Sequence, residues 1–456
     1  MTYPDLDMAA TARKVLGRLI LVAFAIGLAA IRAACLLYRP DLAIKVGTAA
    51  VSQTLCDEVF VSGLDVQRVL REEIQPDPGL RLLRKRLRID VDQRAKRVTV
   101  NWAGHFASVA AFHEGYGCSN WDEAGQAKPE TAKVSSATVP VAPASGKLAE
   151  ALDHAFAEPP HPPYREVRAI VVMRNGTIIA ERYAPGISPD TPLLSYSVSK
   201  SVINALIGIL VRQGKLDLYA PAPVKAWTSP SDPRHAITLD ELLRMTSGLK
   251  LDETDTGFDP VSRMLFTQRD MAAYASGANL KHPPGQVWEY TSGNTLIASS
   301  ILRDAVGGQS ADVLRFAQRE LFGPVGMQHV VMEFDGTGTP IGSTRFFASA
   351  HDWARFGNLY LNDGIVNGQR ILPSGWVAYA TKPTLDSEYG SGFWVNVGRA
   401  QGMPADAFLA SGKNGQRVVV IPSQRLVIVR FGITIDPPNY DIRGLIRLVS
   451  DVIAAQ

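Results

Sequence analysis

The chain has 456 residues, of which 46% are hydrophobic and 20% are charged, and its formal net charge is only +3. This length suggests two or three domains, and the composition is that of a globular protein and not of a disordered one. The nearly neutral charge gives no global sign of nucleic-acid binding. Three cysteines exclude a disulfide-dense scaffold, and no spacing among them and the eight histidines resembles a zinc site. We therefore expect no metal, no organic cofactor and no nucleic-acid partner.

The N-terminal region combines a polar tail, residues 1–18, with a largely apolar stretch, residues 19–38. The apolar core is short for a membrane span and reaches spanning length only if Arg32 extends to the far interface. An uncleaved transmembrane anchor competes with a cleaved signal peptide and with a buried soluble helix. We favour the anchor, because no small-residue cleavage site follows it. This predicts a membrane-anchored protein whose remaining chain is exported.

Residues 40–121 are predicted to be a small N-terminal segment, joined by a linker at 122–145 to the rest of the chain. Apolar and polar residues alternate over 87–92 and 96–102, which predicts a β-hairpin. Two interpretations of Cys56 and Cys118 stay open. They form a disulfide if the segment is exported, or they are two buried free thiols. A basic cluster is most simply a solvated face: Arg81, Arg84, Lys85, Arg86 and Arg88.

Residues 146–456 are predicted to form a second, larger domain. Asn175-Gly176 lies between the apolar runs 169–173 and 178–182, which is a strong hairpin signal. A second hairpin is predicted for 417–421 and 426–430, followed by an apolar helical pattern up to residue 453. Strands at both ends enclose a mainly helical middle. We therefore expect an α+β fold, with one antiparallel sheet flanked by helices and an inserted helical lobe.

A Ser-x-x-Lys pattern, Ser197 to Lys200, opens an apolar helix that is predicted to end near Gly214. On a helix, the two side chains share one face, so an ammonium lies beside a hydroxyl. A serine hydroxyl becomes a nucleophile only with such help. The alternative is a helix-capping serine with a lysine that reaches solvent. The same pattern recurs at 247–250 without a following helix, and there we predict a loop.

Two later stretches change the interpretation of Ser197. The first, 284–294, places Tyr290 on a turn before another apolar helix, and the second, 408–416, is a strand of small residues. Together with Ser197-x-x-Lys200 and the segment Met245-Thr246-Ser247-Gly248-Leu249, these motifs resemble the serine β-lactamase and penicillin-binding-protein superfamily. The resemblance covers about 146–456. It is strongest to the class C-related branch, and within it to 6-aminohexanoate-dimer hydrolases.

The resemblance implies a β-lactamase/transpeptidase-like fold and three catalytic side chains. Ser197 would be the acylated nucleophile, Lys200 its activating partner and Tyr290 the general base. An unperturbed tyrosine is a poor base at neutral pH, and a neighbouring cation lowers its pKa by favouring the phenolate. We therefore expect the ammonium of Lys200 to lower the pKa of Tyr290.

The same resemblance implies several contacts with a substrate. In the family's Tyr-x-Asn motif the third position is Ser292 here, and Asn294 lies two residues further. Ser411 and Gly412 match the end of the Lys-Thr-Gly motif, whose lysine is replaced by Ala410.

The main-chain N–H groups of Ser197 and Lys413 would form an oxyanion hole. The resemblance also places Glu253 at the rim of the family's substrate pocket. Trp394 is predicted to line the acyl pocket, and a core tryptophan is equally compatible with its sequence context.

The expected function is a serine hydrolase that forms an acyl-enzyme with an amide or ester of a small molecule or peptide. A D-alanyl peptidase or a true β-lactamase is the nearest alternative, although Ala410 argues against recognition of a β-lactam carboxylate. A non-catalytic binding or sensor protein of the same fold is an alternative of another class. The presence of Ser197, Lys200 and Tyr290 together argues against it.

Overall fold

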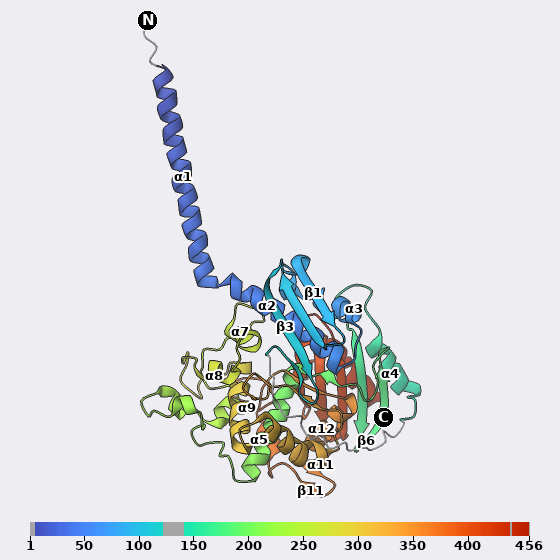
Figure 1. Ribbon diagram of the computed structural model, residues 1–456. Coiled ribbons are helices and arrows are strands. Elements are labelled where there is room, and N and C mark those ends of the chain that lie inside the picture. Colours follow the sequence, from blue (N-terminus) through green and yellow to red (C-terminus); the bar gives the residue numbers. More distant parts are fainter. Residues whose placement is uncertain (1–4, 122–140, 438–439, 456) are drawn as a thin grey trace.

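A computed structural model describes residues 5–121, 141–437 and 440–455. A long helix, α1 (Asp5–Tyr38), extends away from a globular body that contains the rest of the described chain (Figure 1). The predicted linker, 122–145, lies outside the described residues except for 141–145. The helix α4 (Gly146–Phe156) starts at the residue where the second domain was expected to begin.

The predicted transmembrane anchor is not supported. Residues 19–38 are helical as part of α1, but among the described residues no helix is both long enough and apolar enough to cross a membrane. The physical reason is that two charged residues lie too close together in the sequence to leave a spanning apolar run between them. The uninterrupted apolar run, 19–31, lies between Arg18 and Arg32 and falls short of the roughly 20 residues that a spanning helix needs.

The N-terminal segment forms a helix on a small antiparallel sheet. The helix α2 (Pro40–Cys56) packs against β2 and β3, and the strand order follows the chain. The predicted hairpin is confirmed, since Leu87 pairs with Trp102 and Asp92 with Arg97. A disulfide joins Cys56 to Cys118, so the two thiols are not free. The strands are β1 (Leu87–Asp92), β2 (Arg97–Trp102), β3 (His105–His113) and β4 (Gly117–Ser119).

The second domain is built on a six-stranded antiparallel sheet in the order β12-β13-β14-β15-β5-β6. Both predicted hairpins are confirmed, one around Asn175-Gly176 and one around 422–425. The first and last parts of the domain therefore meet at the pair β5–β15. The strands are β5 (Val167–Arg174), β6 (Thr177–Tyr183), β12 (Trp394–Val395), β13 (Phe408–Gly412), β14 (Gln416–Ile421) and β15 (Leu426–Gly432).

Helices cover both faces of this sheet. On one face α4 packs against α14 (Ile442–Ala454), and their apolar side chains form a core with inward-facing strand residues. On the other face lie α12 (Ala350–Leu361) and α5 (Ser199–Arg212), which is almost completely buried. The helix α5 ends before Gly214, which has a φ of 69° as expected of a helix-terminating glycine.

The helical lobe lies between α5 and α12, and its longest helix, α9 (Ser292–Val306), packs against α5. The segment 246–250 is a loop, as predicted. The other lobe helices are α6 (Leu239–Leu243), α7 (Pro260–Thr267), α8 (Met271–Ser276), α10 (Ser310–Ala317) and α11 (Gly323–Val325). The remaining elements are α3 (Val66–Val69), α13 (Trp376–Ala380), β7 (Leu193–Leu194), β8 (Val331–Met332), β9 (Phe346–Ala348), β10 (Ile365–Val366) and β11 (Gln369–Arg370).

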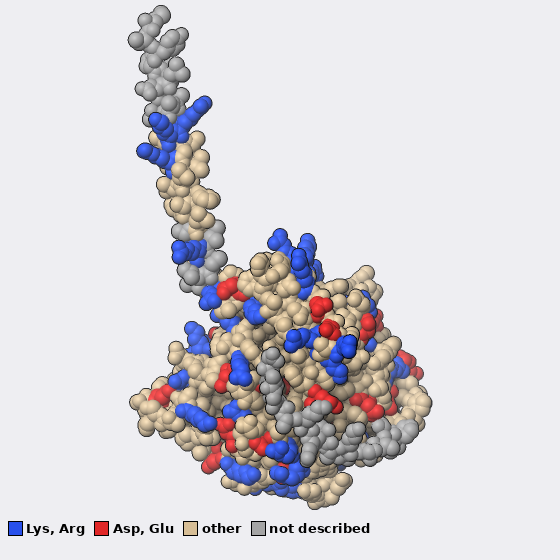
Figure 2. Space-filling model, viewed as in Figure 1, with Lys and Arg blue, Asp and Glu red and all other residues tan. Residues whose placement is uncertain are grey.

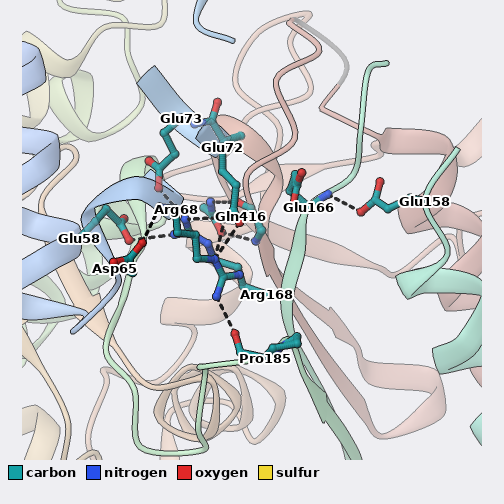
Figure 3. Close-up of polar contacts among 12 residues, drawn as sticks. Glu58, Asp65, Arg68, Glu72, Glu73, Glu158, Glu166, Arg168, Pro185 and Gln416 are labelled. Carbon is teal, nitrogen blue, oxygen red and sulfur yellow. Dashed lines mark hydrogen bonds and ion pairs between the residues drawn. The ribbon is translucent and has the colours of Figure 1, made fainter. Parts of the chain in front are cut away.

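Buried ion pairs join the N-terminal segment to the large domain. Arg168 of β5 contacts Glu58 at 2.8 Å and Glu73 at 2.6 Å, both from the N-terminal segment (Figure 3). A second pair links Arg345 to Asp57. Both segments also contribute to one hydrophobic core. The N-terminal segment is therefore an integral part of the globular body.

The basic cluster 81–88 lies on the exposed surface of the N-terminal segment. Figure 2 shows Lys and Arg side chains gathered over this part of the molecule. Arg81, Arg84, Lys85, Arg86 and Arg88 are all exposed, in agreement with a solvated face.

Candidate functional site

The predicted nucleophile lies on a tight turn between β7 and α5. Ser197 is in the single 3-10 turn Tyr196–Val198, and Tyr196 before it has a φ of 46°, in the left-handed region. Such backbone strain in a residue other than glycine is uncommon and must be held by its surroundings. Here the hydroxyls of Ser195 and Ser199 bond each other at 2.9 Å, and the Ser195 N–H donates to the Phe346 carbonyl at 3.0 Å. The turn presents Ser197 half-buried at the start of α5.

Lys200 lies one helical turn after Ser197 and is almost completely buried. Its Nζ donates to Ser197 Oγ at 2.9 Å, to the Ser343 carbonyl at 2.9 Å and to Ser292 Oγ at 3.2 Å. Burial lowers the pKa of Lys200 to about 8, and the carboxylates of Glu253 and Asp255 oppose this shift. Near neutral pH a useful fraction of Lys200 is therefore an uncharged amine that can accept a proton.

Tyr290 reaches the same site from the turn before α9. Its hydroxyl shares a hydrogen bond with Ser197, and the Nζ of Lys200 lies 4.8 Å from the ring centroid. The expectation of a lowered pKa is wrong. Burial raises the pKa of Tyr290 well above its usual value, and Tyr389 and Glu253 raise it further. The phenol is therefore neutral in the free protein, and the group able to act as base is Lys200.

Ser292 and Glu253 form a connected pair behind Lys200. Ser292 is the first residue of α9, and both its main-chain N–H and its hydroxyl donate to Glu253, at 2.5 Å and 3.0 Å. Burial raises the pKa of Glu253, and the cation of Lys200 opposes the rise. The third position of the tyrosine motif is thus occupied by a serine that contacts both Lys200 and a carboxylate.

Asn294 is not brought to this group. Its side chain is buried, accepts a hydrogen bond from Ser247 at 2.7 Å and contacts the sulfur of Met245. Asn294 therefore links the 245–249 loop to α9. It lies two residues after Ser292 and points to a different side of that helix. This contact gives the Met-Thr-Ser-Gly-Leu segment a structural role beside the site.

The strand β13 passes directly beside the predicted nucleophile, Ser197. A Cβ on Gly412 would lie 2.4 Å from the Ser195 carbonyl oxygen and 3.2 Å from the Ser197 nitrogen, so only glycine fits there. Ser411 precedes it in the same strand, and Ala410 is completely buried. Ser197 and Lys413 both lie at the start of short 3-10 turns, where main-chain N–H groups have no partner within the helix.

The side chain of Lys413 turns away to the rim of the site. Its Nζ pairs with Asp255 at 3.2 Å. Burial lowers the pKa of Lys413, but Asp255 and Asp77 outweigh burial, and the pKa is raised overall. Because Asp77 belongs to the N-terminal segment, that segment borders the site.

Three aromatic rings lie next to Tyr290 and form a cluster of four with it. Trp394 lies 5.5 Å from Tyr290, and Trp288 and Tyr389 lie 6.1 Å and 5.2 Å from Trp394 (ring centroids). Trp394 is half-buried at the sheet edge, so its predicted place near the acyl pocket is compatible with this cluster.

Sequence reasoning missed Trp288 and Tyr389. Trp288 precedes Tyr290 by two residues in the same turn, which was a usable signal. The sequence contains no comparable signal for the role of the Ser343 carbonyl, because it is a main-chain acceptor and is distant in sequence from Lys200.

A family model described as "Beta-lactamase" matches residues 165–438. The chain belongs to the β-lactamase family. The resemblance inferred from the motifs is thereby confirmed, as is the α+β fold.

A 6-aminohexanoate-dimer hydrolase of Paenarthrobacter ureafaciens is 24% identical over 303 residues, which cover 61% of this chain and 75% of that protein. Among solved structures, a putative 6-aminohexanoate-dimer hydrolase from Bacillus anthracis has a TM-score of 0.55 at 24% identity, and the match covers 64% of this chain and 80% of that one. A penicillin-binding-protein homologue from Caulobacter crescentus has a TM-score of 0.53 at 19% identity, covering 69% and 99%. At these identities the structures show the fold alone. The hydrolase relatives support an enzymatic function.

Proposed function

We propose that this β-lactamase family member is a serine hydrolase that forms an acyl-enzyme at Ser197 from an amide or ester of a small molecule or peptide. The observation that carries the proposal is the 2.9 Å contact between Ser197 Oγ and a buried lysine whose pKa is lowered to about 8. Without such a base, a serine hydroxyl is a weak nucleophile.

In the first half of the reaction, the neutral amine of Lys200 accepts the Ser197 proton while Oγ bonds to the substrate carbonyl carbon. The carbonyl oxygen becomes an oxyanion, stabilised by the main-chain N–H groups of Ser197 and Lys413. As the bond to the leaving group breaks, the phenol of Tyr290 donates its proton to the departing nitrogen or oxygen. Lys200 then returns a proton to Tyr290, so the charges balance.

In the second half, water attacks the acyl carbon. The water proton passes to the amine of Lys200 and from there to Ser197 Oγ as the acyl group leaves. This restores the free protein, and no cofactor takes part in these steps.

The half-buried rings of Trp288, Tyr290 and Trp394 favour substrates with an apolar acyl group, because they offer ring surface near Ser197, whose hydroxyl shares a hydrogen bond with Tyr290. Ala410 gives no positive charge where the family motif has a lysine, which disfavours a β-lactam carboxylate. A D-alanyl peptidase or β-lactamase is therefore the weaker candidate.

The disulfide between Cys56 and Cys118 supports an oxidising compartment, so we place the protein outside the cytoplasm within this proposal.

The test is intact-protein mass spectrometry after incubation with p-nitrophenyl butyrate, a p-nitroanilide and a penicillin, with Ser197→Ala beside the wild type. We expect an acyl adduct on the wild type that Ser197→Ala abolishes, formed faster with the ester than with the penicillin. The absence of any adduct on folded wild-type protein would favour a non-catalytic binding protein.

A further inference from the structure

A continuous chain of hydrogen bonds leads from the nucleophile to a carboxylate that no step above uses. Ser197 Oγ contacts Lys200 Nζ at 2.9 Å, Lys200 Nζ contacts Ser292 Oγ at 3.2 Å, and Ser292 Oγ donates to Glu253 Oε1 at 3.0 Å. The other carboxylate oxygen, Oε2, accepts the main-chain N–H of Ser292 at 2.5 Å. Glu253 thus holds both donors of one residue.

The direction of these bonds matters once Lys200 is neutral. An ammonium donates three hydrogen bonds, whereas a neutral amine donates two and has one lone pair. The Ser343 carbonyl, 2.9 Å from Nζ, can only accept a hydrogen bond. A serine hydroxyl can either donate or accept, so Ser292 could compete with Ser197 for the amine lone pair if its single proton were not already engaged.

We propose that Glu253 is a positioning residue: it binds the hydroxyl proton of Ser292, keeps Ser292 an acceptor toward Lys200, and thereby leaves the amine lone pair facing Ser197 alone. This inference rests on the proposed hydrolase function. Glu253 does not touch the reacting atoms in this role and acts only through Ser292 and Lys200.

A positioning effect of Glu253 can be distinguished from a simple electrostatic effect by considering the charged groups around Lys200. Lys200 faces the carboxylates of Glu253 and Asp255 and the ring of Tyr290, and Asp255 is itself paired with Lys413. Glu253 raises the pKa of Lys200, so its neutralisation moves the pH midpoint of acylation below that of the wild type. A purely electrostatic role would change only this midpoint. Loss of positioning lowers the plateau rate at high pH.

The experiment measures the acylation rate with p-nitrophenyl butyrate, from the burst of p-nitrophenolate, between pH 5 and pH 10. The variants are Glu253→Gln, Ser292→Ala and the double variant Glu253→Gln/Ser292→Ala. The two donors of Ser292 bind different oxygens of Glu253, and glutamine replaces one of these oxygens by an NH2 group that can only donate, so the hydroxyl of Ser292 loses its acceptor when the amide oxygen stays with the main-chain N–H. Asp252→Asn, in an exposed pair with Lys281 at 3.1 Å, is the matched control.

We expect Glu253→Gln to lower the plateau about tenfold or more, the effect of one competing hydrogen bond. Ser292→Ala removes the competing hydroxyl, so the double variant should regain the plateau of the Ser292→Ala single variant. An unchanged plateau in Glu253→Gln, or a loss that Ser292→Ala does not restore, would overturn the inference.

If Glu253→Gln folds poorly, Glu253→Ala provides a second test. It also frees the hydroxyl of Ser292, so its plateau should lie below that of Ser292→Ala, which lacks the competing hydroxyl. A Glu253→Ala plateau at or above that of Ser292→Ala would contradict the inference. If wild-type protein forms no adduct at Ser197, the proposed function fails and the inference fails with it; normal wild-type acylation with an unaltered Glu253→Gln plateau refutes the inference alone.

Discussion

At the scale of single residues, the proposed nucleophile, Ser197, is held in place by the backbone as much as by side chains. Tyr196 adopts a left-handed φ of 46° before Ser197, and Gly412 leaves no space for a side chain beside it. The proposed oxyanion hole, formed by the main-chain N–H groups of Ser197 and Lys413, depends on this close approach of β13 to the turn. Small displacements at this point should therefore have large effects on the proposed acylation.

Gly412→Ala tests that dependence. Its new Cβ would lie 2.4 Å from the Ser195 carbonyl oxygen, so the strand and the turn must separate. We expect the acylation rate to fall by roughly 100-fold, because displacements of about 1 Å at a reacting site have effects of this size. Gly412 has an extended backbone, with a φ of -127°, so Gly27→Ala, where a Cβ meets nothing within 4 Å and φ is not positive, is the control for an alanine substitution without a clash. An acylation rate within threefold of wild type in Gly412→Ala would contradict the proposed oxyanion geometry.

Tyr290→Phe tests the proton-donor role. Because burial raises the pKa of Tyr290, we expect the phenol to act as an acid, and its loss should slow p-nitroanilide hydrolysis by about 100-fold or more. Ester hydrolysis should suffer less, since p-nitrophenolate leaves without protonation. Tyr379→Phe, whose hydroxyl bonds Asp240 instead, is the control. Equal losses for ester and anilide would show that Tyr290 has a different role.

At the scale of elements, the N-terminal segment is attached by one disulfide and by buried ion pairs. Cys56 ends α2 and Cys118 lies in β4, and 62 positions separate them in the sequence. Arg168 brings the carboxylates of Glu58 and Glu73 from this segment to the central sheet. These attachments keep Asp77 close to Lys413 at the rim of the site.

Removing the disulfide should lower the free energy of unfolding without removing activity. For a loop of this length, the chain-entropy estimate is about 4 kcal/mol, and measured effects are typically about 2–4 kcal/mol. We expect a Cys56→Ser/Cys118→Ser variant to show a loss of this size in urea unfolding while it still forms the Ser197 adduct. A variant as stable as the wild type would show that the disulfide contributes nothing to the fold.

At the scale of the whole molecule, buried carboxylates make stability depend on pH. Burial raises the pKa of Glu73 to about 8 and that of Asp57 to about 6. The folded state therefore binds these protons more tightly than the unfolded state, so stability falls as the pH rises from about 4 to about 8.

Glu73→Gln should reduce this fall, because the amide has no proton to lose. The measurement is the unfolding midpoint in urea at pH 5, 6, 7 and 8, with Glu388→Gln, at an exposed position, as control. A slope equal to that of the wild type would rule out Glu73 as a source of the pH dependence.

Much of the fold could be predicted from local patterns. The hairpins at 87–102, 169–182 and 417–430 and the helices that begin at 199 and 292 follow from alternation, turn residues and apolar periodicity. The attachment of the N-terminal segment could not be predicted, because Arg168 and its partner Glu58 are 110 residues apart. The predicted membrane anchor is not supported among the described residues, because the apolar run between Arg18 and Arg32 reaches spanning length only when it is counted past a charge.

The candidate site, like the fold, could be predicted only in part from the sequence. Motif order located Ser197, Lys200 and Tyr290, which the structure brings together. Two features depend on tertiary packing and were missed: burial raises the pKa of Tyr290, and the hydroxyl of Ser292 links Lys200 to Glu253. Desolvation is a property of the folded neighbourhood, which sequence spacing does not show.

The most direct test of the central claim is the pH dependence of Ser197 acylation in the wild type, followed by quenched-flow mass spectrometry with p-nitrophenyl butyrate. Because the proposed base is the neutral amine of Lys200, whose pKa is lowered to about 8, the rate should rise about tenfold per pH unit below that value and level off above it. A rate that does not change between pH 6 and pH 9, or an adduct on a residue other than Ser197, would contradict the account.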